Sequence, residues 1–141
     1  MIDAIEKRLS GFNDLALLIG RILIAVLFLV AAYGKLSALS GTVGYFTKLG
    51  VPAPSIVGPL VAVFELTVGV LVLVGFKTRL VALAIAGFVI IAALLAHMDF
   101  ANVAQLNNFT KNLAIAGGCL ALFVSGAGAY SVDAKTSRRF F

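Results

Sequence analysis

Apolar residues gather in four runs of about 17–21 residues, joined by short polar connections. About 20 apolar residues are enough for a helix to cross the hydrocarbon core of a bilayer. The runs predict helices over residues 14–36, 55–74, 79–96 and 109–125. Short connections place consecutive helices antiparallel. We therefore predict an all-α fold, a four-transmembrane-helix antiparallel bundle, in a single domain covering residues 1–141.

Two connections are longer than the others. Residues 37–54 mix apolar positions such as Phe46 with polar ones, which suits a short helix or turn at the membrane interface between the first two helices. Pro52 and Pro54 disfavour helix before the next apolar run begins. Residues 97–108 are polar and rich in Asn and Gln, and they are predicted as a loop.

Positive charges are distributed unequally between the two sides of the predicted bundle. One side carries seven, Lys7, Arg8, Lys77, Arg79, Lys135, Arg138 and Arg139, and the other carries three, Lys35, Lys48 and Lys111. The positive-inside rule then predicts that both termini are cytoplasmic, with Arg79 as a topology anchor at the start of the third helix. The first apolar run is longer than the core of a signal peptide, so we expect a retained helix.

The composition supports a membrane protein and argues against several other classes. Hydrophobic residues make up 62% of the chain, and the mean hydropathy is +1.12. The net charge of +5 lies in the flanks of apolar runs, so nucleic-acid binding is not expected. One cysteine and one histidine allow neither a CxxC pair nor bis-histidine haem ligation within the chain, and we expect no metal site. Any redox chemistry must therefore come from a bound small molecule or another subunit.

Two ionisable residues lie inside apolar runs, where a charge costs on the order of 3 kcal/mol or more. Arg21 lies about 12 Å from the cytoplasmic start of the first helix, and Glu65 lies about 15 Å from the cytoplasmic end of the second. Their nearly equal depth predicts an Arg21–Glu65 ion pair, which serves either as a proton relay or only to fix helix register.

A second polar group is predicted at the outer ends of the helices. Lys35, His97, Lys111 and Asn112 would together form a positively charged mouth facing the bundle interior. An anionic ligand or a carbonyl-bearing headgroup could bind there. The alternative is that the lysines extend to lipid headgroups and that His97 only ends its helix.

Several short stretches, in this order and spacing, resemble the DoxX family of small bacterial membrane proteins. They are Gly20-Arg21 with Gly34-Lys35, Glu65-Leu66 with Gly69, Gly75-Phe76-Lys77-Thr78-Arg79, His97, Phe109 with Lys111-Asn112-Leu113-Ala114, and Gly126-Ala127-Gly128-Ala129-Tyr130-Ser131-Val132-Asp133. The resemblance implies a four-helix bundle in the bacterial inner membrane. The family name is linked to a thiosulfate:quinone oxidoreductase subunit, and other members resemble partners in oxidoreductase or thiol-stress complexes.

These observations favour an integral membrane subunit of a redox system that binds quinone and receives electrons from a partner oxidoreductase subunit. His97, Lys35 or Asn112 would donate hydrogen bonds to the quinone headgroup, while Arg21 and Glu65 would tune or relay a proton. Two alternatives stay open. One is a non-enzymatic anchor or assembly protein for an oxidoreductase or stress-response complex, and the other is a small transporter, which would require a homo-oligomer.

Overall fold

The computed structural model describes residues 11–137 together with Ile2 and Ile5, and residues 11–137 form helices and no strand. The helices are α2 (Asn13–Ser37), α3 (Leu39–Lys48), α4 (Pro54–Val74), α5 (Thr78–Ala96), α6 (Val103–Ser125) and α7 (Val132–Ser137). The predicted bounds of the first three long helices are confirmed to within about one residue. The predicted cytoplasmic charges Lys7, Arg8, Arg138 and Arg139 lie outside the described residues.

The predicted start of the fourth long helix is wrong. Phe109 was expected as its first residue, but α6 begins at Val103, so half of the supposed loop is helical. The side chain of Asn102 accepts a hydrogen bond from the backbone N–H of Ala104 at 3.0 Å and so caps the N-terminus of α6. Apolar periodicity could not reveal these first turns because polar residues (Gln105, Asn107 and Asn108) interrupt them and most of their side chains are exposed.

Three of the described helices, α2, α4 and α5, are long and apolar enough to cross a membrane. α6 has 23 residues, but polar side chains occupy its first turns. Large apolar side chains on the outer faces of the long helices are exposed, as expected where lipid replaces water. A fourth span and the orientation of the termini remain predictions.

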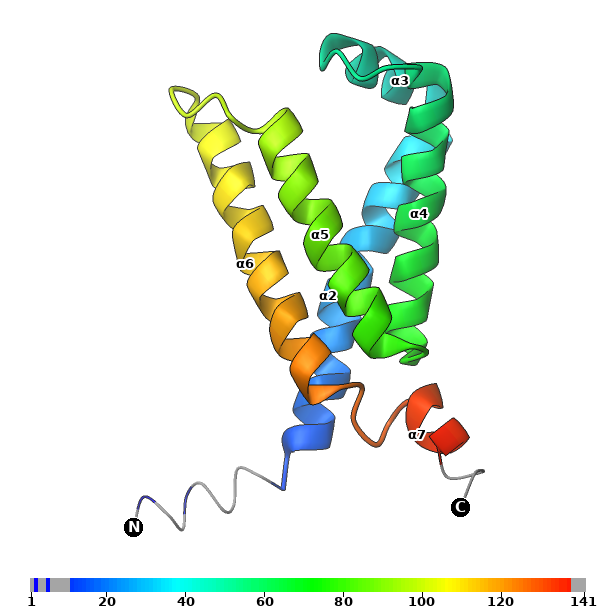
Figure 1. Cartoon of the computed structure of the whole chain (residues 1–141), viewed down its shortest axis with the longest axis vertical. Helices are drawn as coiled ribbons and strands as arrows, with labels where there is room; N and C mark the ends of the chain where they lie inside the picture. Colours follow the sequence, from blue (N-terminus) through cyan, green and yellow to red (C-terminus); the bar gives the residue numbers. More distant parts are fainter. Residues whose placement is uncertain (1, 3–4, 6–10, 138–141) are drawn as a thin grey trace.

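The long helices form two pairs, α2 with α4 and α5 with α6. Figure 1 shows that the pairs converge at the lower end of the view and diverge at the upper end, where α3 covers the α2–α4 pair. A buried apolar cluster that includes Phe28, Val72 and Ile85 joins the pairs. Gly69 on α4 permits close packing, since a Cβ there would lie 3.0 Å from a Leu29 methyl group on α2.

The segment after α6 ties the converging end together. Asp133 accepts hydrogen bonds from the backbone N–H groups of Lys77 and Thr78, at 2.7 and 2.9 Å, and so caps α5 from a distant part of the chain. Asp14 at the start of α2 accepts from the backbone N–H of Ala129 at 2.7 Å. These bonds connect α2, the α4–α5 turn and the tail.

The surroundings of Asp133 favour its ionised form. Partial burial acts to raise the pKa of this carboxyl, but the two backbone N–H groups and the charge of Lys77 outweigh that effect. The pKa of Asp133 is therefore lowered from its usual value, and the carboxylate that caps α5 is charged at neutral pH.

Candidate ligand-binding site

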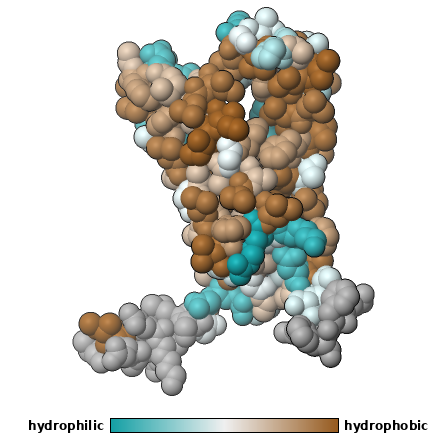
Figure 2. Space-filling view, viewed as in Figure 1, coloured by the Kyte–Doolittle hydropathy of each residue, from teal (hydrophilic) through white to brown (hydrophobic). Residues whose placement is uncertain are grey.

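A cavity of about 420 Å³ lies between the diverging ends of the two helix pairs. Figure 2 shows the surface hollowed between the two arms at the top of the view. Most of its wall is aliphatic or aromatic, with contributions such as Phe28 from α2, Val61 from α4 and Phe88 from α5. Phe46, near the end of α3, also contributes to the wall, so this short helix partly covers the cavity. The polar residues in the wall are Lys35, Tyr45, Glu65, His97, Lys111 and Asn112.

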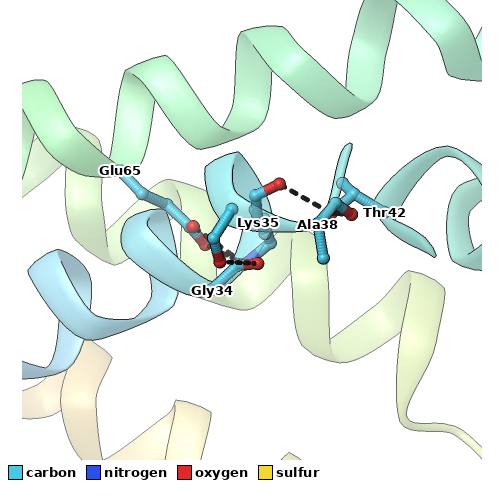
Figure 3. Close-up of polar contacts among 6 residues, drawn as sticks. Gly34, Lys35, Ala38, Thr42 and Glu65 are labelled. Carbon is cyan, nitrogen blue, oxygen red and sulfur yellow. Dashed lines mark hydrogen bonds and ion pairs between the residues drawn. The ribbon is translucent and has the colours of Figure 1, made fainter. Parts of the chain in front are cut away.

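The strongest polar feature of the wall is an ion pair between Lys35 and Glu65. Lys35 Nζ lies 3.0 Å from Glu65 Oε1 and 2.8 Å from Oε2, and Figure 3 shows the two side chains pointing toward each other. The side chain of Glu65 is 7% exposed and that of Lys35 is 26% exposed. Lys35 is therefore the more accessible member of the pair. The backbone carbonyl of Lys35 accepts from the hydroxyl of Thr42 at 3.1 Å, which fixes α3 against the end of α2.

The predicted ion pair between Arg21 and Glu65 is wrong, because Glu65 pairs with Lys35 instead. Lys35 follows Arg21 by 14 residues on the same helix, and a rise of 1.5 Å per residue places them about 21 Å apart. Glu65 lies level with Lys35, so it is far beyond the reach of Arg21. The prediction assumed that α2 and α4 begin and end at the same level, whereas α4 extends past the end of α2 toward α3 (Figure 1).

Arg21 lies at the converging end and is absent from the described cavity wall. Its side chain is 0% exposed, and Nη2 donates to the backbone carbonyl of Tyr130 in the tail. Its Nε and Nη1 atoms have no hydrogen-bond partner among the described residues. The guanidinium packs so closely on the α4–α5 turn that a Cβ on Gly75 would overlap it. Arg21 thus joins α2 to the turn and the tail.

The four residues predicted to form an outer mouth all line the cavity. His97 Nδ1 lies 2.6 Å from Gln105 Oε1, a geometry in which the ring donates through Nδ1–H and leaves Nε2 as the acceptor of the neutral ring. Lys111 is exposed and donates to Asn108 at 3.1 Å. Whether the four bind a ligand stays a prediction.

Gln105 is a residue that the sequence analysis missed. The sequence prediction placed Gln105 in a loop, where the direction of a side chain is not defined. Because α6 begins at Val103, Gln105 lies on a helix, which fixes the direction of its side chain. Asn102, three residues earlier, was the available signal, since Asn often caps a helix N-terminus.

Arg79 lies in the first turn of α5, as predicted, and it is exposed. Its guanidinium faces the end of α6, because a Cβ built on Gly126 would lie 3.5 Å from Arg79 Nε. Its role as a topology anchor remains a prediction. Among the described residues, no three His, Cys, Asp or Glu side chains gather as a metal site would require.

Comparisons with known proteins place the chain in a family. A DoxX family model matches residues 16–98, more than half of the chain. The inner membrane protein YqjF of Escherichia coli strain K12 is 40% identical over 132 residues, which cover 94% of this chain and 100% of the relative. The inner membrane protein YphA of the same strain is 33% identical over 124 residues, covering 84% of this chain and 89% of the relative. No solved structure matches. The chain belongs to the DoxX family and is a multi-pass protein of the bacterial inner membrane, embedded in its lipid bilayer.

Proposed function

We propose that this protein binds a quinone in the cavity between its two helix pairs and serves as the membrane subunit of a redox system. The observation that carries the proposal is a largely apolar cavity with the Lys35–Glu65 ion pair in its wall. Electrons would come from a partner subunit. A quinone takes up electrons together with protons, and the protein supplies binding, orientation and polar contacts to it.

The size and lining of the cavity suit a quinone. Its volume of about 420 Å³ lies within the range of roughly 300–1,000 Å³ that ligand pockets occupy. Aliphatic and aromatic side chains suit a flat ring and an isoprenoid chain, and the surface is hollowed between the two arms of the molecule (Figure 2). A few polar groups in an apolar wall are the usual means of orienting such a ligand.

Four of the six polar side chains in the wall then have distinct roles in holding the quinone. Lys35 and Asn112 would donate hydrogen bonds to a carbonyl. His97, which donates through Nδ1 to Gln105, would present Nε2 and accept a hydrogen bond from the reduced ring. This assignment changes the role expected for His97 from donor to acceptor. Glu65 would hold Lys35 in place.

The proposal is tested by extracting small molecules from the purified protein and identifying them by mass spectrometry. Ala92→Phe, which fills the cavity wall, should abolish co-purification of quinone, whereas Ala114→Phe on the exposed side of α6 should not. Quinone at stoichiometric levels in the wild type and in Ala114→Phe, but not in Ala92→Phe, would support the proposal. Wild-type protein with no quinone above the lipid background would refute it and favour an anchor, assembly or transport role.

We also propose that α6 is the fourth transmembrane helix and that both termini are cytoplasmic. The charge asymmetry supports this orientation, which places the cavity near the outer face of the membrane. Maleimide labelling of single-cysteine variants in a Cys119→Ala background provides the test. Ala101→Cys, between α5 and α6, should react in intact cells, whereas Lys135→Cys in α7 should react only after the inner membrane is permeabilised. The reverse pattern would refute the orientation.

A further inference from the structure

The ammonium group of Lys35 has one N–H donor that Glu65 does not occupy. A lysine ammonium carries three donors, and the two oxygens of Glu65 lie 3.0 and 2.8 Å from Nζ. Figure 3 shows Glu65 and the Thr42 contact on the backbone of Lys35. The remaining donor belongs to the more exposed member of the pair, and both side chains line the cavity. Lys35 can therefore bind one acceptor atom of a ligand while keeping its partner.

The charge of this part of the wall is already balanced. Glu65 neutralises Lys35 at contact distance. The remaining lysine in the wall, Lys111, keeps its charge because its partner Asn108 is a neutral amide, but it is exposed, and water and salt screen its charge. The wall also holds the titratable side chains of His97, which is engaged by Gln105, and of Tyr45. An anionic headgroup that enters beside the pair would lose its water and find the charge of Lys35 already neutralised by Glu65, which is costly at low dielectric.

We infer that Glu65 determines the charge of the ligand: by neutralising Lys35 while leaving it one free N–H, it makes the cavity select a neutral, carbonyl-bearing amphiphile over an anionic one. This inference rests on the proposed quinone site and adds a selectivity rule to it. Glu65 acts through Lys35 and is a positioning residue. The same geometry predicts that removing the carboxylate turns the cavity into a site for anionic amphiphiles, because the charge of Lys35 is then uncompensated.

The experiment compares two probes of similar chain length by calorimetric titration of the purified protein in detergent. Decylubiquinone is neutral and has carbonyl acceptors, and decanesulfonate remains ionised at all working pH values. The measured quantity is the ratio of the two dissociation constants. Glu65→Gln preserves the shape of the side chain and removes its charge, and Lys111→Gln is the control for a cation at the rim.

The wild-type protein should prefer decylubiquinone. Glu65→Gln should shift the ratio toward decanesulfonate by about tenfold or more, equivalent to about 1.4 kcal/mol, whereas Lys111→Gln should leave it nearly unchanged. If Glu65→Gln does not fold, the neutral double variant Lys35→Met/Glu65→Gln replaces it. The double variant should still reject decanesulfonate and should bind decylubiquinone several-fold more weakly, because the donor is lost.

The outcomes separate this inference from the proposed function. Decylubiquinone binding with an unchanged ratio in Glu65→Gln, or with full affinity in the double variant, would overturn the selectivity rule and leave the quinone site standing. A wild-type protein that does not bind decylubiquinone would overturn both. A shift of equal size in Lys111→Gln, but away from decanesulfonate because a cation is lost, would also overturn the inference, because selectivity would then follow the net charge of the wall.

Discussion

Replacing Asp133 with alanine should destabilise the protein by about 2 kcal/mol, because Asp133 caps a helix to which it is not adjacent in sequence. Its two oxygens accept from the backbone N–H groups of Lys77 and Thr78 at 2.7 and 2.9 Å. Loss of an N-cap costs about 1 kcal/mol, and loss of a negative charge at a helix N-terminus costs about 0.5–1 kcal/mol more. The backbone bond from Asp133 N–H to the Gly75 carbonyl, at 2.9 Å, is retained in the variant.

The effect should depend on pH with a defined sign. The pKa of Asp133 is lowered in the folded protein, so the carboxylate stabilises the fold fully above the unfolded-state pKa of about 4. This stabilisation is lost as the pH falls through the lower, folded-state pKa. The difference between the wild type and Asp133→Ala should be constant from about pH 5 to 8 and should shrink below about pH 4.

Equilibrium unfolding in mixed micelles, followed by circular dichroism, measures the difference in free energy of unfolding. Asp99→Ala is the matched control, since Asp99 is an exposed carboxylate in the connection between α5 and α6. Its removal should change stability by less than about 0.5 kcal/mol. Equal losses in the two variants, or a difference for Asp133→Ala that persists unchanged at pH 3, would refute the capping argument.

Two further predictions concern the converging end and the cavity. Gly75→Ala should cost about 3 kcal/mol or more in unfolding free energy, because φ is +71° and a Cβ would overlap the Arg21 guanidinium, whereas Gly50→Ala, with φ of +70° and open space, should cost about 1 kcal/mol. Similar losses in both glycine variants would contradict the packing of Arg21 on the turn. Lys35→Met should cost about 3 kcal/mol because it leaves Glu65 buried without a partner, and a double-mutant cycle with Glu65→Gln should recover part of that loss. Additive losses would mean that the two side chains do not interact.

Hydropathy alone was sufficient to locate α2, α4 and α5, because each is a long apolar run ended by a recognisable signal. Gly75, for example, ends α4 with φ of +71°. α6 was only half visible to the same reasoning, since its first turns are polar. The start of α6 depends on the N-cap at Asn102, a local signal that the pattern of apolar residues does not contain.

In the candidate site, too, the position of a residue along its own helix could be predicted, whereas the displacement of one helix along another could not. Lys35 and His97 lie at the ends of α2 and α5, and Lys111 and Asn112 lie eight and nine residues after the start of α6, so all four line the cavity at the diverging end of the bundle. Their approximate level along the bundle can be read from the sequence numbering. The predicted partner of Glu65 was wrong because the identity of that partner depends on how far α4 is displaced along α2. That displacement follows from the packing of α4 against α2 and from the connection through α3, and neither can be derived from the hydropathy of the sequence.

Polar bonds at the two ends of the bundle connect different elements, and this difference explains why one end closes and the other stays open. At the open end, Lys35–Glu65 joins α2 to α4, and His97–Gln105 joins the end of α5 to α6, so each bond lies within one helix pair. At the closed end, two bonds of the tail run between pairs, from the segment after α6 to Asp14 and Arg21 on α2. Among the residues that the structure describes, apolar contacts alone oppose separation of the pairs at the open end. A ligand held there by polar groups from both pairs would supply the connection that the chain itself lacks, and its binding should therefore stabilise the fold as well as fill the cavity.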